Sequence, residues 1–213
     1  YGKLQVEHSG VLDSDWELFS VLACVLASEI RKKKLQEYLL RLSYQDQLTG
    51  IRNNTSYIRM LNQLLEHPVP VGVAFADLNG LKYLNDTYGH EYGDQALRHL
   101  AEVSMEYFAK DQLYRVSGDE FVIICPEVQE EVFIRQAQLL KERLKQEEQG
   151  LAAFGYLWND GTTAADRLLH GAERLMYQEK QQHYRDSTRR VQECPGYAQA
   201  LYKRYRQREE KEE

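Results

Sequence analysis

The pattern of apolar and polar positions begins with one long helical segment. Residues 16–44 contain neither Pro nor Gly, and apolar side chains recur there at alternating steps of three and four. This spacing predicts a long helix with an apolar stripe that could pair with a second chain. A helix that lies along its own domain is the alternative. The stripe comprises Leu18, Val21, Val25, Leu35, Leu39 and Leu42, and it is interrupted at Ser28 and Lys32.

Beyond residue 54 the pattern alternates between helical and strand-like segments. The order helix, strand, helix, two strands, helix, strand, helix predicts an α/β fold with a mixed central sheet covered by helices. The first strand of this series should lie beside the pair of strands that follows it. The expected helices cover residues 55–66, 95–108, 129–148 and 163–182, and the expected strands cover residues 71–76, 112–117, 120–125 and 151–157. Near the two ends, residues 1–6 read as a strand and residues 197–213 as a charged helix.

The segment YRVSGDEFVII, residues 114–124, concentrates the candidate chemistry. Its β-rich arms predict a hairpin, and Gly118 permits a tight turn with Asp119 and Glu120 at the tip. By itself such a turn is also typical of a solvated hairpin. Asp77, however, follows a buried strand that should neighbour this hairpin. We therefore expect Asp77, Asp119 and Glu120 to form a carboxylate cluster suited to Mg²⁺.

Composition and charge narrow the class of protein. The chain has 213 residues, of which 43% are hydrophobic and 28% charged, as in ordinary globular domains. The net charge of −6 argues against a general nucleic-acid binder. Three widely separated cysteines without a CxxC pair indicate neither a disulfide framework nor a zinc site. Reduced thiols fit a cytoplasmic chain best, and we expect no membrane segment in it, because the apolar run at residues 21–27 is too short to span a bilayer. Membrane attachment of a longer parent protein stays open.

Four motifs in order resemble those of the GGDEF-domain diguanylate cyclases. SGDEF resembles the GGDEF signature, and ADLNGLKYLNDTYGHEYGD resembles the family's DxDxFKxxNDxxGHxxGD block. DQLTGIRNN resembles its DxLTxLxNR segment, and AERLMYQEK resembles its ADxxLYxAK helix. The resemblance covers residues 46–185, and residues 1–30 more weakly resemble the end of a GAF sensor domain. We therefore expect a helical linker at residues 31–45 and a charged helical extension at residues 186–213.

The resemblance implies a palm-like fold and an enzyme that condenses two GTP into cyclic di-GMP within a homodimer. It implies a Mg²⁺ or Mn²⁺ ion at the triphosphate, where phosphoryl transfer needs charge neutralisation and an aligned nucleophile. Asp119 or Glu120 would also help to deprotonate the 3′ hydroxyl. By motif, the roles are metal binding for Asp77, the Leu78 carbonyl and Asp119, catalysis for Asp119, Glu120 and Lys82, and substrate binding for Asn85, Asp94, Gly118 and Lys180.

Five positions depart from the family pattern, and one of them is Tyr184, where the family usually has a basic residue. Ser117 replaces the first Gly of the signature, and it would cost about 1 kcal/mol if the backbone there required φ > 0. Asn79 replaces the second Asp of the long block, and Asn54 replaces an Arg. The family's inhibitory product site uses an RxxD whose Arg position is Phe108 here. The alternative function is therefore a catalytically silent GGDEF domain that binds GTP or a protein partner.

Overall fold

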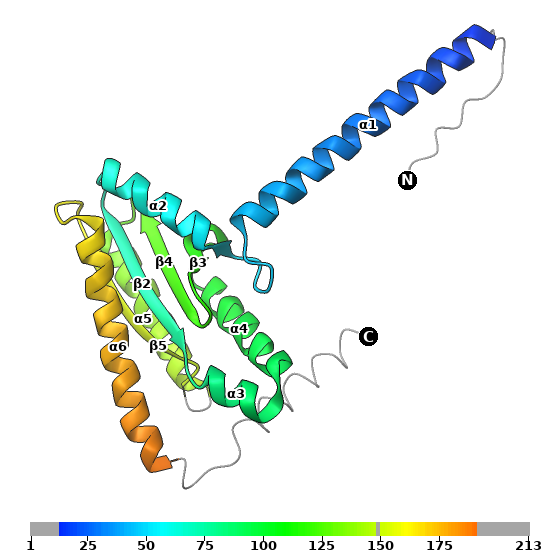
Figure 1. Ribbon diagram of the computed structural model, residues 1–213. Helices are drawn as coiled ribbons and strands as arrows, with labels where there is room; N and C mark the ends of the chain where they lie inside the picture. Colours follow the sequence, from blue (N-terminus) through cyan, green and yellow to red (C-terminus); the bar gives the residue numbers. More distant parts are fainter. Residues whose placement is uncertain (1–12, 148–149, 191–213) are drawn as a thin grey trace. The chain divides into compact units, whose positions relative to one another are not determined.

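The computed structural model describes residues 13–147 and 150–190, and the chain separates into two units, residues 1–43 and 44–213 (Figure 1). The expected strand at residues 1–6 and helix at residues 197–213 lie outside the described residues. In chain order the elements are α1 (Asp13–Tyr44), β1 (Arg52–Asn53), α2 (Asn54–Glu66), β2 (Val71–Leu78), α3 (Leu81–Tyr88), α4 (His90–Met105), η1 (Lys110–Gln112), β3 (Leu113–Arg115), β4 (Glu120–Pro126), α5 (Glu130–Gln146), β5 (Ala152–Asn159) and α6 (Ala165–Arg190).

The first unit consists mainly of α1, a single helix of 32 residues, as the apolar spacing predicted. Its large apolar side chains are exposed in both halves, from Leu22 (48% exposed) to Leu40 (58%). No helix in the described ranges has the length and apolar character needed to cross a membrane.

The second unit is built on a mixed five-stranded sheet in the order β1-β3-β4-β2-β5. β2 runs antiparallel to both β4 and β5, and β3 pairs antiparallel with β4 as the predicted hairpin. All eight residues of β2 are buried, which explains the continuous apolar run at residues 71–76. β1 was not predicted. It is a two-residue strand, parallel to β3, within the segment that links α1 to α2.

Helices cover both faces of this sheet (Figure 1). On one face, α4 and α5 pack through Leu100, Phe133 and Leu140 against residues such as Phe121 and Phe154. On the other face, the apolar side of α2 and α6 forms a second core with alternate residues of the same strands. That core includes Leu64, Val73, Val122, Ile124, Leu169 and Met176. The predicted α/β architecture is thus confirmed.

Two helix boundaries differ from the sequence prediction. The glycine-rich stretch after β2 forms two helices, because Gly89 adopts φ 92° and ends α3 before α4 begins at His90 rather than at residue 95. α6 continues to Arg190 instead of ending at residue 182, so the expected boundary after residue 185 falls inside a helix. The sequence marks a helix end only weakly where the residues are charged, because an exposed helical turn can continue without apolar residues.

Candidate functional site

The carboxyl end of β2 and the start of β4 bring the acidic residues together. Asp77 is the register partner of Glu120, so both side chains lie on the same face of the sheet. The Leu78 amide donates to the Asp119 carbonyl at 3.1 Å and ties the strand end to the hairpin turn. Asp77 is only 5% exposed. The predicted meeting of this strand with the hairpin is therefore correct.

Asp77 carries an unfavourable charge in this position. Burial raises its pKa above the ordinary value, and the negative charges of Asp119 and Glu120 raise it further. Lys180 opposes both effects, since its Nζ lies 2.5 Å from Asp77 Oδ1. α6 thus brings Lys180 to the acidic site and pairs it with the Asp77 carboxylate, while the phosphate contact that the motif implies stays a prediction.

The donor atoms at this point are hard oxygens, which Mg²⁺ and Mn²⁺ prefer. The expected three-carboxylate cluster is not formed, because no group of three His, Cys, Asp or Glu side chains within residues 13–147 and 150–190 is placed to hold a metal ion. Asp119 lies in the turn just before β4, and its negative charge, like that of Glu120, still acts on Asp77. A buried carboxylate with further acids nearby and a raised pKa nevertheless fits a divalent cation.

A cleft of about 1050 Å³ opens from Asp77 and Glu120 along one side of α6. Along α6 it is lined by Lys180 and by two arginines, Arg167 and Arg174, at helical spacing, with one further acid, Glu173, among them. Cations beside the carboxylates can neutralise phosphate oxygens without occupying a metal position. The cleft therefore joins an acidic end, where a cation would bind, to a basic wall suited to phosphate.

The two residues assigned to guanine recognition come from different helices. Asn85 lies on α3 and Asp94 on α4, and Gly93 allows the two helices to approach closely. A Cβ at position 93 would fall 2.0 Å from Asn85 Oδ1, a buried atom that has no hydrogen-bond partner among the described residues. Lys82 is exposed on α3. Sequence reasoning gave Gly93 no role, although a glycine inside a helix is itself a sign of close packing.

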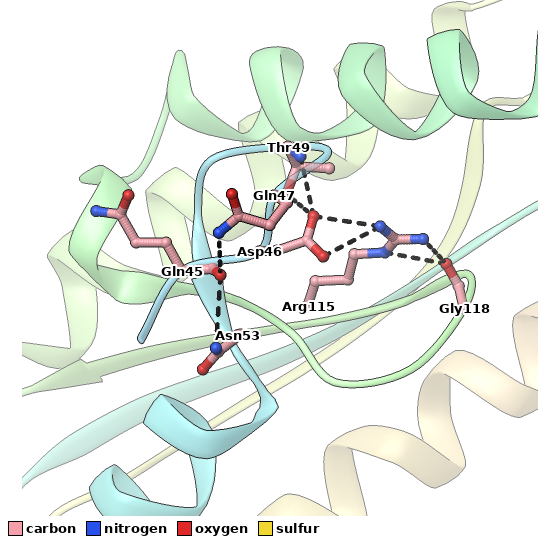
Figure 2. A network of polar contacts seen from close by, with 7 residues as sticks. All are labelled: Gln45, Asp46, Gln47, Thr49, Asn53, Arg115 and Gly118. Carbon is pink, nitrogen blue, oxygen red and sulfur yellow. Dashed lines mark hydrogen bonds and ion pairs between the residues drawn. The ribbon is translucent and has the colours of Figure 1, made fainter. Parts of the chain in front are cut away.

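Arg115 is a second residue that sequence reasoning missed (Figure 2). Its Nε and Nη2 both donate to the Gly118 carbonyl, at 3.1 and 2.7 Å, inside the SGDEF turn. Its Nη1 donates to both carboxylate oxygens of Asp46, each at 3.2 Å. The Arg115 guanidinium, 69 residues beyond Asp46, thus joins the DQLT segment to the signature turn. A planar group with a fixed fork of donors is required for this geometry.

The Asp46 carboxylate is held from two sides. Burial disfavours its charge, but hydrogen bonds from the Thr49 amide and hydroxyl, at 2.9 and 2.7 Å, together with the Arg115 charge, outweigh that cost. The pKa of Asp46 is therefore lowered. The same loop is fixed to α2, because Ser56 Oγ donates to the Tyr44 carbonyl at 2.7 Å.

Ser117 is less of an obstacle than its departure from the signature indicated. Among the described non-glycine residues only Glu127 has a positive φ, so Ser117 does not occupy the left-handed region. Its side chain is exposed. The anticipated backbone penalty is therefore absent. Phe108, unlike Ser117, is buried in the core. Its ring is 3% exposed, and its centroid lies 5.9 Å from that of the Phe133 ring.

The sequence model of the family described as diguanylate cyclase, GGDEF domain, matches residues 43–186. The chain belongs to the GGDEF-domain family. Among curated relatives, the response regulator PleD of Caulobacter vibrioides is 32% identical over 118 residues, which are 50% of this chain and 26% of PleD. The cyclic di-GMP phosphodiesterase PdeR of Escherichia coli K12 is 30% identical over 127 residues, 58% of this chain and 19% of PdeR. The chain thus spans about a fifth to a quarter of these relatives.

Solved GGDEF structures share the fold of this chain. The coiled coil and GGDEF domain of DgcB from Caulobacter crescentus, solved in complex with c-di-GMP, superposes with a TM-score of 0.63 at 21% identity. The match covers 77% of this chain and 94% of the DgcB chain. This likeness establishes the mixed sheet and its covering helices as the GGDEF fold.

Proposed function

We propose that this GGDEF domain is a cytoplasmic diguanylate cyclase that condenses two GTP into cyclic di-GMP. The observation that carries the proposal is one cleft that contains Asp77, Glu120 and Lys180 at the meeting point of β2, β4 and α6. Acids for a cation and bases for phosphate are the groups that nucleotidyl transfer requires. Their place at the signature turn of a GGDEF domain selects this chemistry among others.

Each side chain then has a defined task. Asp77, Asp119 and the Leu78 carbonyl would hold Mg²⁺ or Mn²⁺, which supplies positive charge at the triphosphate. Lys82 and Lys180 neutralise phosphate charge as it develops. Asp119 or Glu120 accepts the proton of the 3′ hydroxyl. Asn85 and Asp94 hydrogen-bond the guanine, and Asp94 accepts from its N1–H and amino group, which adenine does not offer as a pair.

One such domain holds one GTP, so the reaction requires two domains that face each other. A homodimer formed through α1 would bring two loaded sites together and raise their effective concentration. The support for this arrangement is the exposed apolar surface of α1, which a second copy would bury.

The direct test is incubation of the purified chain with GTP and Mg²⁺, followed by chromatographic detection of cyclic di-GMP. We expect product with GTP, and at least about tenfold less turnover with ATP because buried guanine hydrogen bonds are lost. An Asp77→Asn variant should give none. Absence of product from the wild-type chain at concentrations that favour dimers would reject the proposal.

A second candidate is a silent GGDEF domain that binds GTP or a protein partner. The departure of Ser117 from the signature motivates it, and the relative PdeR, which is named a phosphodiesterase although it matches this domain, favours it. The Ser117→Gly variant separates the two functions. Unchanged turnover would show that Ser117 is tolerated, as its exposed, unstrained position leads us to expect, whereas a large gain would show that the natural turn is impaired.

A further inference from the structure

Asn79 lies two residues after Asp77, where β2 leaves the sheet, and it stands where the family block has an Asp. It is buried, with 6% exposure. Its Nδ2 donates to the Gly150 carbonyl at 3.0 Å, and its backbone N–H donates to the Leu151 carbonyl at the same distance. The turn after the candidate metal ligands is therefore attached to the loop between α5 and β5.

Gly150 and Leu151 offer a firm anchor. The Gly150 amide donates to the Glu147 carbonyl at 2.8 Å, and the Leu151 amide donates to the Leu144 carbonyl at 2.9 Å, so these two residues are fixed to the end of α5. Glu147 is itself buried, at 8% exposure, and it forms a close ion pair with Arg143. Asn79 thus ties a short irregular turn to a helix end that is held by its own polar contacts.

The chemistry at this position requires an amide. The Gly150 carbonyl can only accept a hydrogen bond, which an ionised carboxylate cannot provide. Asn79 Oδ1 is buried and has no hydrogen-bond partner among the described residues. A carboxylate here would face the Gly150 oxygen with one oxygen and would lack a donor for the other, so its charge would be both desolvated and repelled.

We propose that Asn79 is a positioning residue that holds the Asp77–Leu78 end of β2 in the geometry that a divalent cation needs. The Leu78 amide is bonded to the Asp119 carbonyl on the hairpin side, and Asn79 supplies the attachment on the opposite, α5 side. The family's own residue, introduced as Asn79→Asp, should therefore weaken this protein. The metal part of this inference rests on the proposed function.

The test compares wild type, Asn79→Asp and Asn79→Leu in the full chain. Two properties are measured: the thermal unfolding midpoint without nucleotide, and the Mg²⁺ concentration at half-saturation for binding of a non-hydrolysable GTP analogue. For Asn79→Asp we expect a midpoint about 5 °C lower and a half-saturating Mg²⁺ concentration about tenfold higher. Asn79→Leu lacks the hydrogen-bond donor but adds no charge, so its half-saturating Mg²⁺ concentration should rise about threefold. This variant also allows the test to be made if Asn79→Asp does not fold.

Asn159→Asp is the matched control at the far end of β5. The Asn159 Oδ1 accepts from the Gly161 and Thr163 amides, each at 2.9 Å, and a carboxylate accepts equally well. The Asn159 Nδ2 donates to the Thr163 hydroxyl at 3.1 Å, and this hydroxyl can instead donate to a carboxylate, so the variant should behave as wild type. Wild-type Mg²⁺ binding by the Asn79→Asp variant would overturn the proposal, and so would a lower midpoint with an unchanged Mg²⁺ requirement. A wild-type chain that binds the analogue but makes no cyclic di-GMP would reject the proposed function alone.

Discussion

At the scale of single residues, the signature turn depends on a side chain outside the signature. Arg115 is 16% exposed and holds the Gly118 carbonyl with two of its donors. A turn that carries catalytic carboxylates is effective only when its backbone is held in one geometry. Arg115 therefore matters to Asp119 and Glu120 without contacting substrate.

The first prediction concerns the Arg115→Gln variant. It removes the ion pair with Asp46 and one arm of the bond to Gly118, so we expect the free energy of unfolding to fall by about 2 kcal/mol. The turnover number should fall more than the affinity for GTP, because the carboxylates of the turn lose their position. Urea unfolding and steady-state kinetics measure the two effects.

Arg52→Gln is the matched control for that variant. Arg52 Nη2 is 4.0 Å from Asp111 and the side chain is 41% exposed, so the loss should stay within about 0.5 kcal/mol. Equal losses for both variants would show that Arg115 has no special part in holding the turn.

The second prediction follows from the lowered pKa of Asp46. The pKa of Asp46 in the unfolded chain is near the ordinary value of 3.8, and its pKa in the folded protein is lower. Its contribution to stability is therefore full above pH 3.8 and is lost as the pH falls through the folded pKa. The stability difference between wild type and Asp46→Asn should therefore be constant near neutral pH and shrink below about pH 4. Urea unfolding of both proteins across this range tests it, and a difference that grows toward acid pH would contradict it.

At the scale of elements, glycines decide how closely helices approach their neighbours. A Cβ at Gly155 would fall 2.2 Å from the Met176 backbone nitrogen, so α6 packs directly on the backbone of β5. Gly93 has the same role between α4 and α3. Neither position needs an unusual backbone angle, since their φ values are not among the positive ones. Glycine is required at these two positions only because a larger residue would not fit in the space.

The third prediction is that Gly93→Ala destabilises the protein, although the same change in an unconstrained helix stabilises it by about 1 kcal/mol. The new Cβ would meet Asn85 Oδ1 at 2.0 Å and Leu81 Cδ1 at 2.8 Å. We expect a loss of about 1–3 kcal/mol and weaker binding of GTP, because Asn85 must move. Unfolding and equilibrium binding of a GTP analogue provide the measurements.

Gly118→Ala is the stability control for that variant. Nothing lies within 4 Å of a Cβ built at Gly118, so its free energy of unfolding should not decrease. If Gly93→Ala proves as stable as wild type, the close contact of α3 with α4 is not required.

At the scale of the whole molecule, α1 exposes apolar surface that the described part of the chain does not cover. Its large apolar side chains are between 40% and 60% exposed, which is unfavourable for an isolated helix in water. The fourth prediction is that the Leu35→Asp and Leu39→Asp double variant weakens dimerisation and lowers cyclic di-GMP synthesis at least about tenfold, while it leaves GTP binding unchanged. Sedimentation velocity and product assays at matched concentrations test it.

The control for the double variant places two acids beside the stripe. The Lys33→Asp and Gln36→Asp variant changes exposed polar residues of the same helix and should remain dimeric and active. If the Leu35→Asp and Leu39→Asp variant makes cyclic di-GMP at the normal rate, α1 does not control the reaction.

The sequence by itself determined the α/β class, the hairpin and the strand that delivers Asp77, because apolar periodicity and turn residues are local signals. The motifs also located Lys180 on its helix. Only the tertiary structure decided that Arg115 grips the Gly118 carbonyl, that Gly93 makes room for Asn85, and that Asn79 donates to Gly150. These contacts join residues far apart along the chain or depend on which atom faces which, and no local pattern records that geometry.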